Sequence, residues 1–145
     1  MTHQLEHLPP STLKPWANNA RTHSKRQLKQ IVKSISTFGF TNPILIDDDN
    51  NILAGHGRVE AAKSLRMEMV PCLRQSQMSA EEKRAYVLAD NKLALNAGWD
   101  DEILATELGA LYELDLDFDV EITGFTISEV DNLIDGLSVE EDGEP

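Results

Sequence analysis

Residues 54–63 read AGHGRVEAAK, and this stretch decides how the first half of the chain is interpreted. Two glycines flank His56, Arg58 follows, and the residues from Val59 to Lys63 are mostly strong helix formers. Glycine lets the backbone approach a ligand closely, and a helix N-terminus offers unpaired N–H donors with a partial positive charge. The stretch therefore predicts a cradle for an anion such as phosphate.

Other interpretations of the stretch stay open from the residues alone. A Gly-x-Gly turn between a strand and a helix is often only a tight connection. His56 can exchange a proton near neutral pH, which makes it the candidate catalytic residue. A metal site is less favoured, because the four histidines are scattered and no two share a helix face. The stretch does not complete a dinucleotide motif, because Glu60 stands at the third glycine position.

The flanking sequence predicts a mixed α and β domain. Residues 43–54 are typical of a β-hairpin, residues 67–73 of a further strand, and residues 5–16 of an extended segment with an edge strand. Ser24 is expected to cap one helix, and the pairs Ser79 with Glu82 and Thr126 with Glu129 are expected to form capping boxes. The helices are expected at residues 25–38, 59–65, 79–95, about 101–114 and 127–137.

Charge is divided unevenly along the 145 residues, whose net charge is −12. All 13 Lys and Arg lie between Lys14 and Lys92, whereas residues 93–145 carry sixteen acids and no base. This acidic half is either a solvated, solubilising segment or a segment that docks onto a basic partner or mimics the charge of DNA. Anionic ligands are therefore expected on the first 92 residues.

The organisation predicted from these patterns is a core domain over residues 1–95, followed by a helical acidic extension over residues 96–138 that packs on the core. Residues 139–145 are expected to form a disordered tail. The only cysteine, Cys72, excludes an internal disulfide, and a cytoplasmic location is expected. No apolar run approaches the ~20 residues needed to span a bilayer, so no membrane partner is expected.

Further side chains in the first half are candidates to contact the anion or its counter-ion. Ser34 borders the apolar stripe of the helix over residues 25–38, and Arg21 is a loop cation. Asp90 and Asn91 place oxygens side by side, which suits Mg²⁺. The alternative for each of them is an ordinary role: a boundary residue, a solvated cation, or a polar helix end.

Four segments, residues 13–46, 52–72, 88–104 and 121–134, together resemble the ParB/sulfiredoxin superfamily. More closely, the chain resembles the ParB-like domains, often labelled nuclease, that are joined to DNA methyltransferases in bacteria and phages. The resemblance covers roughly residues 5–137. It implies an α+β fold: a small mixed sheet with packed helices, followed by a helical acidic segment.

The resemblance also implies a site for CTP or ATP with Mg²⁺. The residues that it assigns to the nucleotide and its phosphates are Ser34, Asn42, Pro43, Gly55, His56, Gly57, Arg58 and Val59, near the loop cation Arg21. It assigns the metal to Asp90 and Asn91.

The chain departs from its relatives at several positions. Gly57 stands where ParB proteins usually have the first of two arginines, and no arginine follows Asn91, so the resemblance does not extend to CTP hydrolysis or clamp behaviour. His56 replaces the reactive cysteine of sulfiredoxin, and no methyltransferase motif is present. The chain is also expected to leave no room for the helix-turn-helix and dimerisation domains of ParB.

These observations predict a nucleotide-binding module that acts in DNA binding, segregation or modification, as the regulatory part of a DNA methyltransferase system. One alternative is a ParB-like nuclease, nucleotide hydrolase or kinase with His56 as its catalytic residue. Another is a protein-interaction domain that docks through its acidic half. The expected partners are a nucleotide, DNA, a DNA-modifying enzyme and a second copy of the chain.

Overall fold

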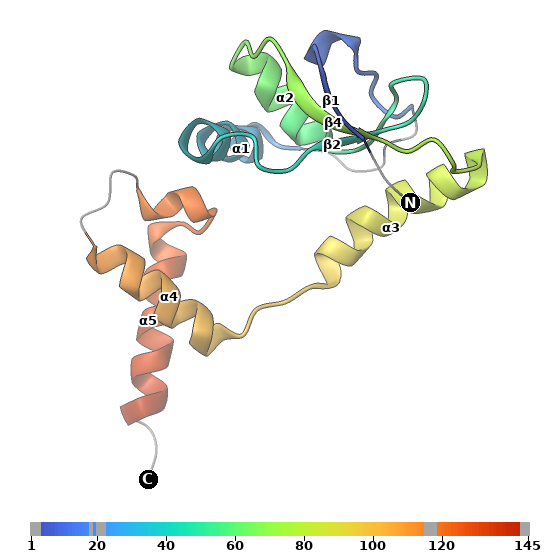
Figure 1. The fold of residues 1–145 in the computed structure, drawn as a ribbon. Coiled ribbons are helices and arrows are strands. Elements are labelled where there is room, and N and C mark those ends of the chain that lie inside the picture. Colours follow the sequence, from blue (N-terminus) through green and yellow to red (C-terminus); the bar gives the residue numbers. More distant parts are fainter. Residues whose placement is uncertain (1–3, 18, 20–22, 115–118, 143–145) are drawn as a thin grey trace. The chain divides into compact units, whose positions relative to one another are not determined.

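The chain folds into two compact units, Met1–Asn96 and Ala97–Pro145. The computed structural model describes residues 4–17, 19, 23–114 and 119–142, and Figure 1 traces the chain through both units. The division falls within one residue of the boundary expected after residue 95. Among the described residues, no helix combines the length and the apolar character needed to cross a membrane.

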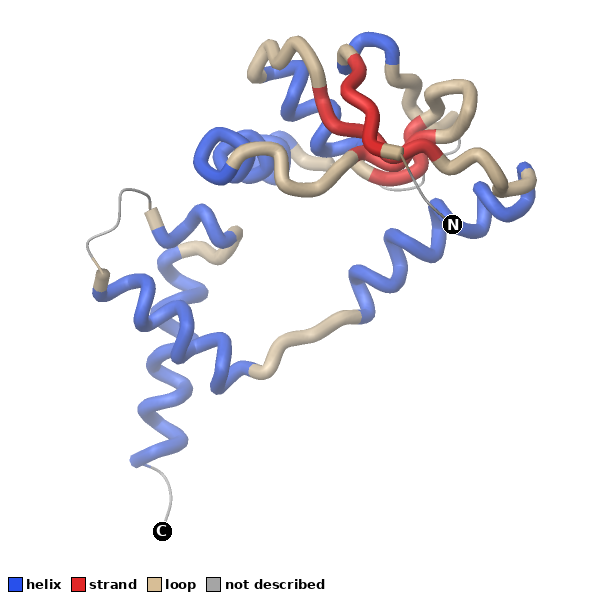
Figure 2. The backbone as a smooth tube through the Cα atoms, in the orientation of Figure 1, coloured by secondary structure: helices blue, strands red, loops and turns tan. Residues whose placement is uncertain are grey.

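The first unit is built on a four-stranded mixed sheet, drawn in red in Figure 2. Its strands are β1 (Leu5–Leu8), β2 (Ile44–Ile46), β3 (Ile52–Ala54) and β4 (Val70–Arg74), in the order β1-β4-β2-β3. The β1–β4 and β2–β3 pairs are antiparallel, and the central β2–β4 pair is parallel. This arrangement confirms the predicted hairpin, the edge strand near the N-terminus and the α+β class. The strand expected at residues 67–73 begins later, at Val70.

Asp47 organises the hairpin turn between β2 and β3. Its side chain is 2% exposed. It accepts hydrogen bonds from the backbone N–H groups of Asp49 (2.9 Å) and Asn51 (2.8 Å) and from the Asn51 side-chain amide (3.0 Å). The Lys83 ammonium lies 3.2 Å from its second oxygen. Burial alone would raise the pKa of Asp47, but the hydrogen bonds outweigh burial and hold this pKa below its ordinary value.

Two helices frame the anion pocket predicted from the sequence. Helix α1 (Lys25–Phe38) begins at Ser24, whose hydroxyl accepts from the Gln27 N–H at 3.1 Å, so the predicted cap is confirmed. Helix α2 (His56–Ser64) begins three residues before the start expected at Val59. Its N-cap is Gly55, with φ of +106°, a left-handed conformation that glycine adopts without strain. His56, Gly57 and Arg58 therefore belong to the first helical turn.

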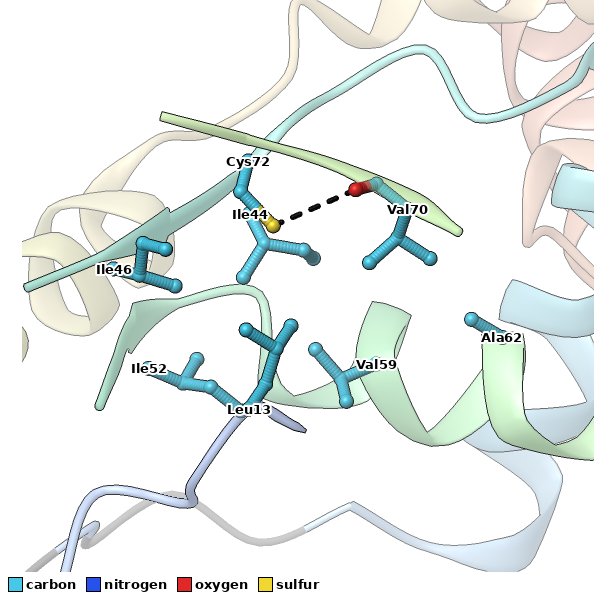
Figure 3. Packing of buried hydrophobic residues seen from close by; sticks show 8 residues of the cluster. All are labelled: Leu13, Ile44, Ile46, Ile52, Val59, Ala62, Val70 and Cys72. Atoms are coloured by element: carbon cyan, nitrogen blue, oxygen red, sulfur yellow. Dashed lines mark hydrogen bonds between the residues drawn. The ribbon is translucent and has the colours of Figure 1, made fainter. Parts of the chain in front are cut away.

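Helix α2 covers one face of the sheet and packs against α1 on its other side. Figure 3 shows the apolar residues that meet between the sheet, α2 and the N-terminal segment. These buried residues are Leu13, Ile44, Ile46, Ile52, Val59, Ala62, Val70 and Cys72. Burial raises the pKa of the Cys72 thiol, which lies 3.6 Å from the Val70 carbonyl, so this cysteine is an inert core residue.

Helix α3 (Ala80–Asn96) closes the first unit and packs against β3. The predicted capping box is confirmed, because the Ser79 N–H donates to the Glu82 carboxylate at 3.0 Å and the Glu82 N–H donates to the Ser79 hydroxyl at 3.1 Å. The ion pair between Lys83 and Asp47 fixes the start of α3 to the hairpin turn. The middle of α3 thereby comes to lie beside the end of β3.

The second unit is helical. It contains α4 (Asp101–Glu113), a 3-10 turn η2 (Val120–Thr123) and α5 (Ile127–Asp142). The capping box of Thr126 and Glu129 is confirmed by bonds of 3.1 and 3.2 Å. The core of the second unit consists of Leu108, Val120 and Val130. Six partly buried apolar residues pack around them: Leu104, Leu111, Phe125, Ile127, Leu133 and Ile134. Because α5 runs to Asp142, the expectation of disorder from residue 139 onward is wrong for residues 139–142.

Candidate anion-binding site

A cavity of about 190 Å³ lies where α1, α2, α3 and the end of β3 meet. The first turn of α2 forms one wall with Gly55, His56, Gly57 and Arg58. Asp90 and Asn91 of α3 also line it. The fold therefore brings together six of the residues singled out in the sequence, from two segments more than 30 positions apart.

Four other predicted residues, all of them described in the structure, are not among those that line this cavity: Ser34, Asn42, Pro43 and Val59. Ser34 is half-buried on α1, and Asn42 is exposed before β2. Val59 is 1% exposed and belongs to the core, and its N–H donates to the Gly55 carbonyl at 2.9 Å. Its side chain and its backbone N–H are therefore both engaged within the protein.

Two predicted positions remain, Pro43 and Arg21. Pro43 does not line the cavity, but its carbonyl accepts a hydrogen bond of 3.2 Å from Arg58. It therefore holds a residue of the site. Arg21 lies outside the described residues.

Arg58 is the central cation of the cavity. Its Nη2 donates a hydrogen bond to the Pro43 carbonyl, whereas its Nε is buried and has no hydrogen-bond partner among the residues that the structure describes. Burial lowers the pKa of the Arg58 guanidinium, and Asp90 acts in the opposite direction. An arginine stays protonated at any physiological pH, so this group is a fixed charge with a buried donor left unpaired. An unpaired buried donor costs about 1–3 kcal/mol, and a bound anion is one way to satisfy it.

The two glycines of the stretch are required by close contacts. A methyl group on Gly55 would lie 2.7 Å from Cδ1 of Ile44 and 3.0 Å from Nη2 of Arg58. A methyl group on Gly57 would lie 2.9 Å from Cδ1 of Ile31 and 3.1 Å from Cε1 of His23. Gly55 therefore makes room for the arginine, and Gly57 lets α1 approach the first turn of α2.

His56 has a structural bond that the sequence did not reveal. Its Nε2 accepts a hydrogen bond of 3.0 Å from the backbone N–H of Trp16, forty residues away. Burial lowers the pKa of the imidazole, and the charge of His23 lowers it further. The ring is thus neutral near pH 7, and its Nε2 lone pair holds the N-terminal segment against α2. This geometry gives His56 a positioning role, and the catalytic role stays a prediction.

Asp90 and Asn91 offer oxygens at the opposite wall of the cavity. The Asn91 side-chain N–H donates to the Val87 carbonyl at 3.0 Å. The described residues contain no group of three or more His, Cys, Asp or Glu side chains that could hold a metal by themselves. A cation here would need ligands from a bound anion.

Sequence reasoning missed the contribution of α1. His23 and Gln27 line the cavity, together with Ile31, and Nδ1 of His23 lies 3.1 Å from Oε1 of Gln27. The signal that could have found them is the helical spacing of residues 27 and 31, which places both on one face.

Comparisons with known proteins agree with the fold and the sequence motifs. The protein-family model of the ParB N-terminal domain matches residues 1–92, and the model of the ParB-methyltransferase HTH domain matches residues 102–145. A curated relative, the ParB-like nuclease domain-containing protein YnaK of Escherichia coli (strain K12), is 48% identical over 81 residues. That match covers 56% of this chain and 93% of the relative.

Solved structures show the same architecture. The C-terminally truncated ParB of Caulobacter crescentus complexed with CTP-gamma-S aligns with a TM-score of 0.73 at 21% identity, over 93% of this chain and 79% of that one. The same protein complexed to the centromeric parS site aligns with a TM-score of 0.52 at 19% identity, over 89% and 70%. At such identities the likeness concerns the fold alone.

The fold and the cavity define a ParB-like α+β domain with a helix N-terminus and an arginine at its pocket. The chain belongs to the ParB N-terminal domain family. The match over residues 102–145 corrects the expectation that no room remains for a helix-turn-helix domain. The matched range contains nearly all of α4 and the whole of α5.

Proposed function

We propose that this protein is a nucleotide-binding module whose cavity holds the phosphates of a nucleoside triphosphate, and that it acts with DNA or a DNA-modifying enzyme. The observation that carries the proposal is the buried Nε of Arg58 beside the first turn of α2, which has no hydrogen-bond partner within the described parts of the chain. In that turn the N–H groups have no intrahelical partner, so they add donors and partial positive charge. The ParB relative that was crystallised with a CTP analogue supports the choice of nucleotide.

A divalent cation, Mg²⁺, belongs to the same proposal. Asp90 lines the cavity, and a carboxylate beside phosphates is repelled unless a cation lies between them. The Asp90 carboxylate and the Asn91 amide oxygen are hard donors of the kind that Mg²⁺ prefers, and phosphate oxygens would complete its ligands. The cation would neutralise the charge that Asp90 and the phosphates share.

The proposal concerns binding rather than turnover. A general base must present a lone pair to the proton that it removes. Nε2 of His56 is already occupied by the Trp16 N–H, so this atom cannot serve without releasing the N-terminal segment. Hydrolysis or nuclease action therefore remains the alternative function, to be judged by release of phosphate or cleavage of DNA.

Calorimetric titration with CTP, ATP and GTP in the presence of Mg²⁺ tests the proposal. We expect one of them to bind, and Arg58→Ala to weaken binding by about 10- to 100-fold, the effect of losing a hydrogen bond to a charged group. Arg84→Ala is the matched control, because Arg84 is an exposed arginine of α3 outside this cavity. No binding of any nucleotide by the wild type, or equal binding by Arg58→Ala, would refute the proposal.

DNA association is a second proposed property, and the exposed face of α1 favours it. This face carries Lys25, Arg26, Lys29 and Lys33, and α1 contains no acidic residue. In the part of the chain that the structure describes, none of the four forms a salt bridge. Cations aligned on one helix face suit the phosphates of a duplex.

Fluorescence anisotropy with a short labelled duplex tests this second property. Each neutralised contact lowers the slope of log affinity against log salt by about 0.9. We therefore expect the slope to fall by about 2 in the double variant Lys29→Gln/Lys33→Gln. Lys63→Gln is the control, because that lysine pairs with Glu60 on α2 at 3.7 Å. An unchanged slope in the double variant would exclude α1 as the DNA-facing surface.

A further inference from the structure

The ring of His23 lies against the backbone of Gly57, at the mouth of the anion cavity. His23 is the residue before the N-cap of α1, and Gly57 is in the first turn of α2. A methyl group on Gly57 would lie 3.1 Å from Cε1 and 3.3 Å from Nε2 of His23. The missing side chain at position 57 is therefore what lets this imidazole reach the cavity.

Gln27 fixes the orientation of the ring. Nδ1 of His23 lies 3.1 Å from Oε1 of Gln27, one turn further along the chain. With this amide oxygen as acceptor, Nδ1 carries the proton, and Nε2 is the nitrogen next to Gly57. A second proton on Nε2 leaves the bond to Gln27 intact, and it creates an imidazolium beside the first turn of α2.

We propose that His23 is a phosphate-contacting residue of this cavity, and that Gly57 is its structural partner. The inference rests on the proposed function, because it adds a contact to the same site. Protonated His23 supplies a second positive charge next to Arg58. Because a proton on this ring adds positive charge beside Arg58, we expect the affinity of the cavity for a polyphosphate to be higher at about pH 6 than at about pH 8.

The charged surroundings of His23 support this role. Arg58 and the neutral ring of His56 line the cavity from α2, and Asp90 lines it from α3. The neighbours from α1, Gln27 and Ile31, are uncharged. A polyphosphate in the cavity lowers the cost of placing the imidazolium near Arg58, so binding of the anion and protonation of His23 are coupled.

Titration of the full chain with inorganic triphosphate at about pH 6 and about pH 8 tests the inference. The variants are His23→Gln and the control His7→Gln, which alters an exposed histidine of β1. At pH 6 we expect His23→Gln to bind about tenfold more weakly than the wild type, equivalent to about 1.4 kcal/mol. At pH 8 we expect the two to agree within about twofold, and His7→Gln to follow the wild type at both pH values.

The Gly57→Ala variant adds a test of the pairing. If Gly57 acts by admitting His23, Gly57→Ala weakens binding at pH 6 in the wild-type background and much less in the His23→Gln background. Thermal unfolding of each variant checks that the fold is kept. Equal, additive effects of the two substitutions would refute the pairing.

The outcomes separate this inference from the proposed function. If the wild type binds no triphosphate, CTP, ATP or GTP at either pH, the proposed function fails. If the wild type binds and Arg58→Ala does not, while His23→Gln matches the wild type at both pH values, only the role of His23 is refuted. A pH dependence that persists in His23→Gln refutes it as well, because the titrating group then lies elsewhere.

Discussion

Replacement of Asp47 by alanine is expected to destabilise the first unit by about 3 kcal/mol. Asp47 accepts three hydrogen bonds within the hairpin turn and one from the Lys83 ammonium. Breaking a buried ion pair by removing one partner costs about 3–5 kcal/mol. The low end of that range applies here, because the Lys83 side chain is 20% exposed and can turn toward water.

Equilibrium unfolding in urea at pH 7, followed by circular dichroism, measures this loss. Asp48→Ala is the control: this exposed neighbour accepts a bond from the Ser76 hydroxyl at 2.8 Å, and its removal is expected to cost less than about 0.5 kcal/mol. The pKa of Asp47 is lowered in the folded state, so its contribution is complete above about pH 4 and is lost as the pH falls through the folded value. The difference between wild type and Asp47→Ala should therefore shrink in acid. A loss equal to that of Asp48→Ala at pH 7 would refute the reasoning.

Three further predictions concern single side chains. Because the pKa of His56 is lowered on folding, the unfolded chain binds its proton more readily, so urea stability should fall below about pH 6.5 and fall less in His56→Gln. Gly55→Ala should destabilise the first unit by about 1–3 kcal/mol in thermal unfolding, whereas Gly109→Ala in α4, which meets only ordinary contacts, should stabilise the second by about 0.5–1 kcal/mol. Val130→Ala, at a fully buried site, should cost the second unit about 2 kcal/mol in calorimetry.

The features predicted correctly from the sequence are those fixed by residues a few positions apart. The cap at Ser24 and the capping boxes of Ser79 and Thr126 each join groups three residues apart. The hairpin over residues 43–54 likewise depends on a local turn. Such bonds compete only with the solvent and the local chain, so a short window of sequence contains most of the information that determines them.

The features that were missed depend on contacts between distant segments. The bond from the Trp16 N–H to His56 spans forty positions, and that from Lys83 to Asp47 spans 36. The early start of α2 depends on the left-handed backbone of Gly55, which packing against Ile44 fixes in place. A motif thus predicted where the cavity lies, but it did not predict that His56 accepts a hydrogen bond from the Trp16 N–H or that His23 also lines the cavity.

The charge of the second unit limits what its family match implies. Lys and Arg neutralise the phosphates of a DNA backbone, and residues 102–145 contain neither, although a helix-turn-helix model matches them. The cations of this chain all lie between Lys14 and Lys92. Any contact of this chain with a nucleic acid backbone is accordingly expected on the first unit, whereas the acidic second unit is better suited to a basic protein surface.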